Sequence, residues 1–116
     1  MNEAQFKGKL VKKLRSALPS LVIFRHEDMF TAGIPDLSVT RPGFPNPATL
    51  WLEAKITPSY KISGIQDRTL WRLGGYYILY NNKSSDYTVA LPRTGEVIFE
   101  GTFLGLLGFV TRTLAL

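Results

Sequence analysis

Two acids and a lysine stand on segments whose pattern is otherwise that of buried β-strands. Asp36 follows Pro35 in the stretch GIPDLSV, and Glu53 and Lys55 lie within LWLEAKI, residues 50–56. Residues two apart on a strand share a face, so Glu53 and Lys55 point to the same side. Apolar residues occupy the other side of both segments. Each segment therefore has one apolar face and one face that carries an acid.

The two segments are predicted to pair as a hairpin. Between them lies RPGFPNPA, whose prolines cannot continue a central strand. A symmetric hairpin around Phe44 and Pro45 pairs residues whose numbers sum to 89, which places Asp36 opposite Glu53. Opposed Cβ atoms lie about 5 Å apart. The alternation on both strands limits any other register to even shifts.

Two carboxylates at this separation repel each other and need a positive partner. Lys55 supplies part of it, and a divalent cation supplies more, because Mg²⁺ binds one or two carboxylates together with waters and phosphate oxygens. Such an ion polarises a phosphate and activates water, while an ammonium orients that water or stabilises developing charge. The residues therefore indicate phosphodiester hydrolysis. The alternative is an Asp36 that closes a turn and an exposed Glu53–Lys55 pair.

The remaining pattern predicts an α/β sheet with helices packed on it. A first helix over residues 2–17 is expected to be capped by Asn2, and a second over 64–73 by Ser63. The inward residues of the second helix are expected to be Ile65, Leu70 and Leu73. Strands are expected over residues 21–25, 36–40, 49–56, 76–80, 87–91 and 96–100, and a last helix over 103–114.

Length and composition limit the class of protein. The 116 residues favour a single domain, residues 1–116, without room for a separate specificity domain. Fourteen Lys and Arg against nine Asp and Glu give a net charge of +5, which suits a polyanionic partner. The absence of cysteine excludes a disulfide framework and a cysteine zinc site. We expect no membrane partner and a cytoplasmic, intracellular location.

The same residues resemble a known nuclease superfamily. Gly33-Ile34-Pro35-Asp36, then Glu53-Ala54-Lys55, then Gln66 and Trp71 on the following helix, are similar to the PD-(D/E)XK motif. More specifically, they resemble the virus-type replication-repair nuclease domain, VRR-NUC, in its stand-alone phage-like form. The resemblance covers about residues 3–80. It implies a restriction-endonuclease-like core, a mixed central β-sheet flanked by helices.

The resemblance also implies a role for each motif residue. Asp36 and Glu53 would bind Mg²⁺ or Mn²⁺, and the backbone carbonyl of Ala54 would complete the inner shell. Lys55 would position or activate the attacking water. Gln66 would support the site from its helix by contacting metal-bound water or phosphate.

The first helix and the entry to the second need separate comment. Glu3 matches the first-helix acid that often joins the site in this superfamily. Its alternative role is that of a first-turn acid that interacts favourably with the helix dipole. The family usually has a Leu-Ser-Pro type entry before the glutamine. This chain has Ile62-Ser63-Gly64, in which Ser63 still caps the helix.

The expected activity is that of a metal-dependent endonuclease acting on DNA. Contacts to nucleic acid are expected from Lys7, Tyr60, Lys61 and Arg68, and each could instead be an ordinary surface residue. Phosphate contacts give affinity without sequence readout. We therefore expect selectivity for DNA structure, in branched, flapped or junction DNA. We also expect a homodimer that is joined through the apolar C-terminal helix and whose two sites address both strands.

Two rival functions use the same fold differently. The first is a non-catalytic nucleic-acid binding module on a nuclease scaffold, which predicts DNA binding that survives loss of Asp36 and needs no metal. The second is a small structural or inhibitor protein, which predicts weak, salt-sensitive DNA binding and no metal affinity. Neither rival explains why the chain combines Asp36, Glu53 and Lys55.

Overall fold

The computed structural model describes residues 1–27, 33–58 and 62–116 of the chain. Its helices are α1 (Glu3–Ala17), α2 (Gly64–Arg72) and α3 (Phe103–Thr113). Its strands are β1 (Val22–Arg25), β2 (Leu37–Arg41), β3 (Ala48–Thr57), β4 (Tyr76–Asn81), β5 (Tyr87–Ala90) and β6 (Val97–Gly101).

The six strands form one mixed sheet in chain order, from β1 to β6. Neighbouring strands are antiparallel except β3 and β4, which are parallel. A parallel pair needs a crossover connection, and α2 lies within it. The predicted fold class, a mixed central sheet flanked by helices, is confirmed.

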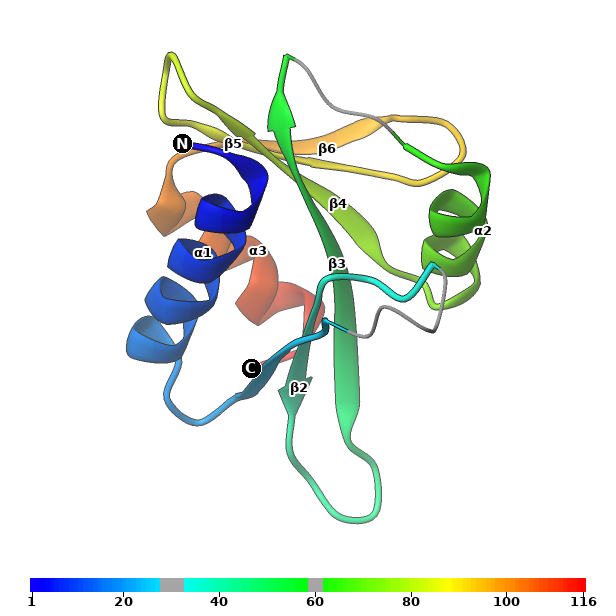
Figure 1. Cartoon of the computed structure of the whole chain (residues 1–116). Helices are drawn as coiled ribbons and strands as arrows, with labels where there is room; N and C mark the ends of the chain where they lie inside the picture. Colours follow the sequence, from blue (N-terminus) through cyan, green and yellow to red (C-terminus); the bar gives the residue numbers. More distant parts are fainter. Residues whose placement is uncertain (28–32, 59–61) are drawn as a thin grey trace.

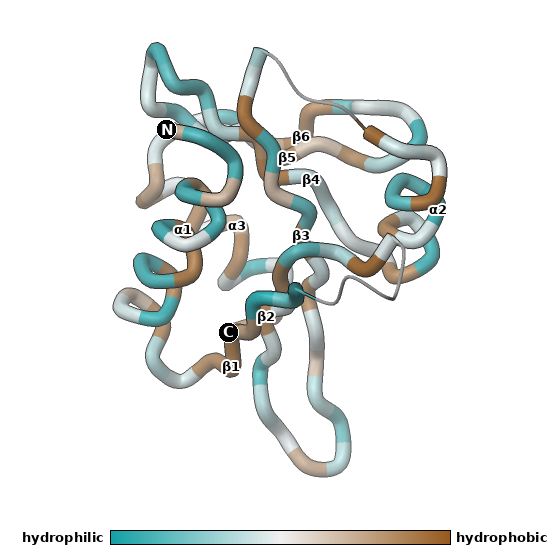
Figure 2. Tube along the Cα trace, in the orientation of Figure 1, coloured by the Kyte–Doolittle hydropathy of each residue, from teal (hydrophilic) through white to brown (hydrophobic). Residues whose placement is uncertain are grey.

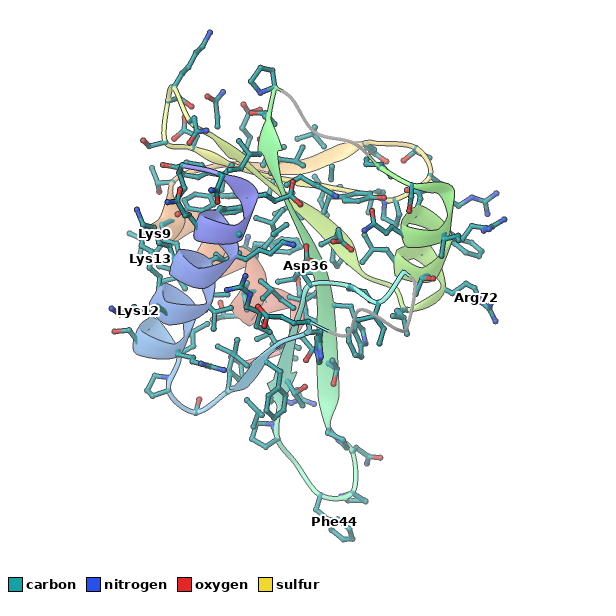
Figure 3. All side chains as sticks on the ribbon, viewed as in Figure 1. Lys9, Lys12, Lys13, Asp36, Phe44 and Arg72 are labelled. Atoms are coloured by element: carbon teal, nitrogen blue, oxygen red, sulfur yellow. The ribbon has the colours of Figure 1, made fainter. Side chains whose placement is uncertain are left out.

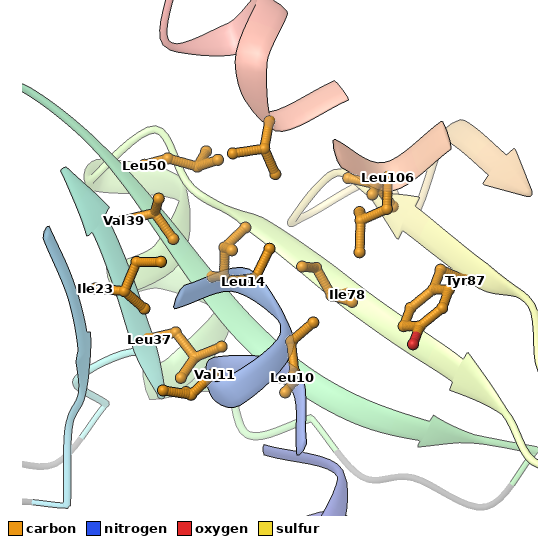
Figure 4. Packing of buried hydrophobic residues seen from close by; sticks show 14 of the residues in the cluster. Leu10, Val11, Leu14, Ile23, Leu37, Val39, Leu50, Ile78, Tyr87 and Leu106 are labelled. Carbon is orange, nitrogen blue, oxygen red and sulfur yellow. The ribbon is translucent and has the colours of Figure 1, made fainter. Parts of the chain in front are cut away.

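The helices cover both faces of the sheet (Figure 1). On one face α1 and α3 form the main core, in which Leu10 and Leu14 meet Val39 and Leu106 (Figure 4). On the other face α2 packs Leu70 into a smaller cluster of Tyr77, Leu79, Ala90 and Trp51. None of the described helices is long and apolar enough to cross a membrane.

Local sequence explains where α1 and α2 begin. The Asn2 side chain accepts a hydrogen bond from the Gln5 backbone at 2.8 Å, and the Gln5 side chain accepts one from the Asn2 backbone at 2.9 Å. Hydropathy changes within each turn of α1, whose apolar side faces the sheet (Figure 2). Ser63 caps α2 by accepting from the Gln66 backbone at 3.1 Å. Both predicted caps are confirmed.

The prediction that α2 buries three apolar residues is wrong. Leu70 is buried, but Ile65 is 49% exposed and Leu73 is 41% exposed. The helix is short and buries Leu70 alone, whereas Ile65 lies beside Gly33 at the start of the helix.

The predicted register of the hairpin is confirmed. Leu37 pairs with Leu52 and Val39 with Leu50, so the numbers of paired residues sum to 89. Phe44 stands fully exposed at the tip of the connecting loop (Figure 3). Strand β2 begins only at Leu37, whereas β3 runs on to Thr57. The last part of β3 therefore has β4 on one side and the turn that carries Asp36 on the other.

Candidate functional site

The two acids meet just before the first residue of β2, where β3 continues past its pairing with β2. Asp36 lies in the turn before β2, over the middle of β3 (Figure 3). Its Oδ2 accepts a hydrogen bond of 2.9 Å from the Ala54 backbone N–H. The N–H and C=O of one strand residue point to the same edge, so the Ala54 carbonyl faces the side on which Asp36 lies. The predicted oxygen donors of Asp36, Glu53 and Ala54 are thus brought together.

Helix α1 adds two charged side chains to these residues. The Lys7 ammonium lies 2.8 Å from Asp36 Oδ1 and 3.8 Å from Glu3 Oε1. Glu3 Oε1 also lies 3.7 Å from the Lys55 ammonium. Glu3 therefore joins the site through its two lysine neighbours. We refer to Glu3, Lys7, Asp36, Glu53 and Lys55 as the charged cluster.

The approach of Lys7 to Asp36 is the feature that sequence reasoning missed. Lys7 was predicted as a contact to DNA from its charge alone, and its pairing with Asp36 depends on how α1 crosses the sheet. One signal was available, because Glu3 and Lys7 are four residues apart on one helix face. A contact between Lys7 and phosphate stays a prediction.

Two members of the charged cluster are buried rather than exposed. Glu53 is 1% exposed and Lys55 is 6% exposed, although both lie on the polar face of β3. The alternative of an exposed Glu53–Lys55 pair on a solvated sheet is therefore wrong. Buried charges are costly unless they are paired or bind a metal ion.

The pKa values of the two acids are shifted in opposite directions. Burial raises the pKa of Glu53 to about 9, and the hydrogen bond and charge of Asp36 add to the shift. Burial also acts to raise the pKa of Asp36, but hydrogen bonds from Glu53, Lys7 and the Ala54 N–H outweigh it and lower that pKa. At neutral pH the pair holds one proton, carried by Glu53.

The donor set fits a hard divalent cation with few protein ligands. Within the described residues there is no group of three or more His, Cys, Asp or Glu arranged around one point. Two carboxylates and one carbonyl are nevertheless enough for Mg²⁺, which usually keeps several waters. The Oε2 atom of Glu53 is buried without a hydrogen-bond partner. An unpartnered buried oxygen beside Asp36 is what an ion with oxygen ligands would satisfy.

The other predicted residues lie away from the charged cluster or outside the described residues. Gln66 is half-buried on α2, and none of the described residues hydrogen-bonds its side chain, so its supporting role stays a prediction. Arg68 is exposed on α2. Tyr60 and Lys61 lie outside the described residues.

The single histidine has a structural position. His26 Nε2 lies 2.7 Å from Ser38 Oγ, and its ring packs 5.4 Å from the ring of Trp51. These contacts tie β1 to the two strands that carry the site. The histidine therefore has hydrogen-bonding and packing roles.

The mixed sheet and its flanking helices form a restriction-endonuclease-like α/β fold. Among solved structures the chain is similar to Hjc from Archaeoglobus fulgidus, a Holliday junction resolvase from an archaeal hyperthermophile. The TM-score is 0.58 at 16% sequence identity, and the match covers 87% of this chain and 88% of that chain. No family model matches the sequence, and no curated protein matches it. The likeness at this identity shows the fold.

Proposed function

We propose that residues 1–116 form a single metal-dependent endonuclease domain that hydrolyses phosphodiester bonds in DNA. The observation that carries the proposal is the pairing of a half-buried Asp36 with a buried Glu53, which has one carboxylate oxygen unpartnered and two lysines alongside. Most buried polar atoms in proteins have a hydrogen-bond partner, so an unpartnered oxygen here supports a site for a ligand. We also propose that the protein is related to the VRR-NUC domains, because its motif resembles theirs.

Ala54, Lys55 and Lys7 each have a task that follows from their position beside the two acids. The Ala54 N–H holds the Asp36 carboxylate in a fixed orientation. The Lys55 ammonium is buried beside the carboxylates, where it would orient a water for attack and stabilise the charge that develops. Lys7 balances Asp36 before substrate binds and would then be free to meet a phosphate oxygen.

The cofactor is proposed to be Mg²⁺ or Mn²⁺, held by Asp36, Glu53 and the Ala54 carbonyl. When bound, such an ion polarises the phosphate and makes water more acidic. Because Glu53 is protonated at neutral pH, binding of the ion requires that this proton leave. The unpartnered Oε2 atom of Glu53 is the oxygen placed to accept the ion.

We propose branched DNA as the substrate, with the four-way junction first among the structures to test. Support comes from the fold shared with a Holliday junction resolvase. A homodimer would bring two sites to the two strands of a junction. This step is proposed from the symmetry of the substrate.

The proposal is tested by cleavage of labelled DNA. Single-stranded, duplex, flapped and four-way substrates are incubated with Mg²⁺, Mn²⁺ or EDTA, and with wild type, Asp36→Asn and Lys55→Met. Lys83→Met serves as the control, because Lys83 lies exposed in the turn between β4 and β5. We expect cutting that needs metal, that both site variants lose, and that the control keeps.

The same proteins and substrates, tested for DNA binding as well as for cutting, separate the nuclease from the binding module. DNA binding by wild type and Asp36→Asn alike, without cutting under any metal condition, would replace the nuclease with the binding module. Sedimentation of the protein with and without a four-way junction tests the homodimer. A strict monomer on the junction would contradict it.

A further inference from the structure

An exposed tryptophan on α2 is surrounded by three arginines. Trp71 is 53% exposed, and the Arg93 guanidinium lies 4.7 Å from the centre of its ring. Arg68 and Arg72 precede and follow Trp71 on the same helix, and these four side chains line one shallow cavity. We call Arg68, Trp71, Arg72 and Arg93 the Trp71 patch. A groove of about 670 Å³ continues from it between the end of α2 and the turn at residues 92–94.

The backbone holds Arg93 in place at some cost. Its φ is +70°, a left-handed conformation that residues other than glycine rarely adopt. Both carboxylate oxygens of Asp67 accept from the Arg93 backbone N–H at 3.2 Å, and Asp67 Oδ1 also accepts from the Tyr77 hydroxyl at 2.6 Å. Strained backbone that neighbouring groups hold is more common at functional sites. The guanidinium is thus placed on Trp71 before any ligand arrives.

The patch lacks a negative partner within the described part of the protein. No described acid forms an ion pair with Arg68, Arg72 or Arg93, and Asp67 is occupied by the two donors above. Guanidinium groups bind phosphate through paired N–H donors. An exposed indole offers its face to a nucleobase. Together these groups suit a ligand that carries both phosphates and aromatic rings.

Helix α2, which carries three residues of the Trp71 patch, lies on the face of the sheet to which Glu53 belongs. Glu53 on β3 is the register partner of Tyr77 on β4, and Tyr77 hydrogen-bonds Asp67 on α2. Arg72 points away from the molecule on the α2 side, opposite the α1 lysines Lys9 and Lys12 (Figure 3). A DNA strand that leaves the carboxylates on this side would run towards α2, which carries Arg68, Trp71 and Arg72.

We propose that the Trp71 patch is a second DNA contact, in which Arg68, Arg72 and Arg93 bind phosphates of one strand and Trp71 stacks on an unpaired base. This inference rests on the proposed nuclease function, because it assigns the path of the strand that the site cuts. It also gives a physical reason for preferring DNA with unpaired bases, as in a flap.

The test is binding of DNA in EDTA, where cutting cannot occur. Affinities for a thymidine oligomer and for a four-way junction are measured by fluorescence anisotropy over a series of NaCl concentrations. Arg72→Gln/Arg93→Gln is compared with Lys12→Gln/Lys83→Gln, which removes the same charge from exposed residues elsewhere. We expect about tenfold weaker binding for the arginine variant and a salt slope lower by about 1.4 on the oligomer. The control should remain within about twofold.

Tryptophan emission gives a readout that charge alone would not move. In Trp51→Phe the emission comes from Trp71, and stacking on a thymine should quench it as the oligomer binds. Trp71→Phe, which keeps Trp51, should show no such quenching. Trp51 reports on a different place, because it lies on β3 and packs against His26 and the smaller cluster around Leu70.

The outcomes separate this proposal from the nuclease itself. Equal binding by the arginine variant and its control, with Trp71 emission unchanged, would overturn the patch while metal-dependent cutting leaves the nuclease intact. Loss of binding in the arginine variant without cutting by wild type would support the patch and overturn the nuclease. Wild type that binds no DNA would overturn the patch, and an acidic protein would then be the ligand to seek.

Discussion

Protonation of Glu53 predicts an unusual dependence of stability on pH. The pKa of Glu53 is about 9 in the folded protein against an ordinary value of 4.5. Between these values the folded state holds one more proton than the unfolded state, so the free energy of unfolding falls as pH rises. The contribution is fully present below about pH 4.5 and is lost as pH rises through about 9. Between pH 5 and pH 8 the loss is about 4 kcal/mol.

Asp36 does not cancel this effect in the same range. Its pKa is lowered from an ordinary value of 3.8, so its contribution is present above that value and is lost as pH falls through the folded pKa. From pH 5 to pH 8 it is ionised in both states. The slope in that range therefore reports on Glu53.

The assay is urea unfolding in EDTA at several pH values from 5 to 8, followed by circular dichroism. Glu53→Gln replaces the protonated acid with a neutral amide of the same shape, so its stability should change little over this range. It should match wild type near pH 5 and exceed it by several kcal/mol at pH 8. Glu96→Gln is the control, because Glu96 is exposed in the turn before β6.

Two results would refute the reasoning. One is a wild-type stability that stays level or rises from pH 5 to pH 8. The other is a falling stability that Glu53→Gln keeps unchanged, which would assign the proton to a different group. Added Mg²⁺ should stabilise wild type at pH 8 and leave Glu53→Gln almost unaffected, because the amide is a poor ligand.

The remaining predictions concern the lysines and two glycines. Lys7→Met removes the cation 2.8 Å from Asp36 and should tighten Mn²⁺ binding by about tenfold in calorimetry; unchanged or weaker binding would contradict a competition between the two cations. Lys55→Met should keep Mn²⁺ binding but cut DNA at least about 100-fold more slowly, and equal loss of both would show a structural role instead. Gly75→Ala should cost about 1–3 kcal/mol in thermal unfolding, because a Cβ would lie 2.5 Å from a leucine methyl and 2.6 Å from a backbone oxygen. Gly64→Ala, where a Cβ meets nothing within 4 Å, should be neutral or stabilising by up to about 1 kcal/mol.

The features that could be predicted from sequence depend on short-range periodicity. Alternation along the two hairpin strands determines which side chains share a face, and the loop between them determines the register that brings Asp36 to Glu53. The caps at Asn2 and Ser63 depend on contacts three residues apart. Such information lies within one turn or one hairpin and can be read directly.

The features that could not be predicted depend on how distant segments pack. Lys7 reaches Asp36 only because α1 crosses the sheet at that point, and Arg93 reaches Trp71 only because a turn after β5 folds back onto α2. The burial of Glu53 requires cover from several elements at once. Periodicity marks Glu53 as lying on a polar face but does not show whether that face meets water.

The order of the strands has a consequence for how the molecule is made. Every strand pairs with its neighbour along the chain, so most of the sheet can assemble by adding one strand at a time as the polypeptide leaves the ribosome. Helix α3 cannot join until the end of synthesis, because its Leu106 and Val110 close the core against α1 from the other end of the chain. Until those residues emerge, the apolar surface under α1 stays open on one side. A nascent chain stalled before α3 should therefore already hold the paired acids yet still be a target for chaperones that recognise exposed apolar surface.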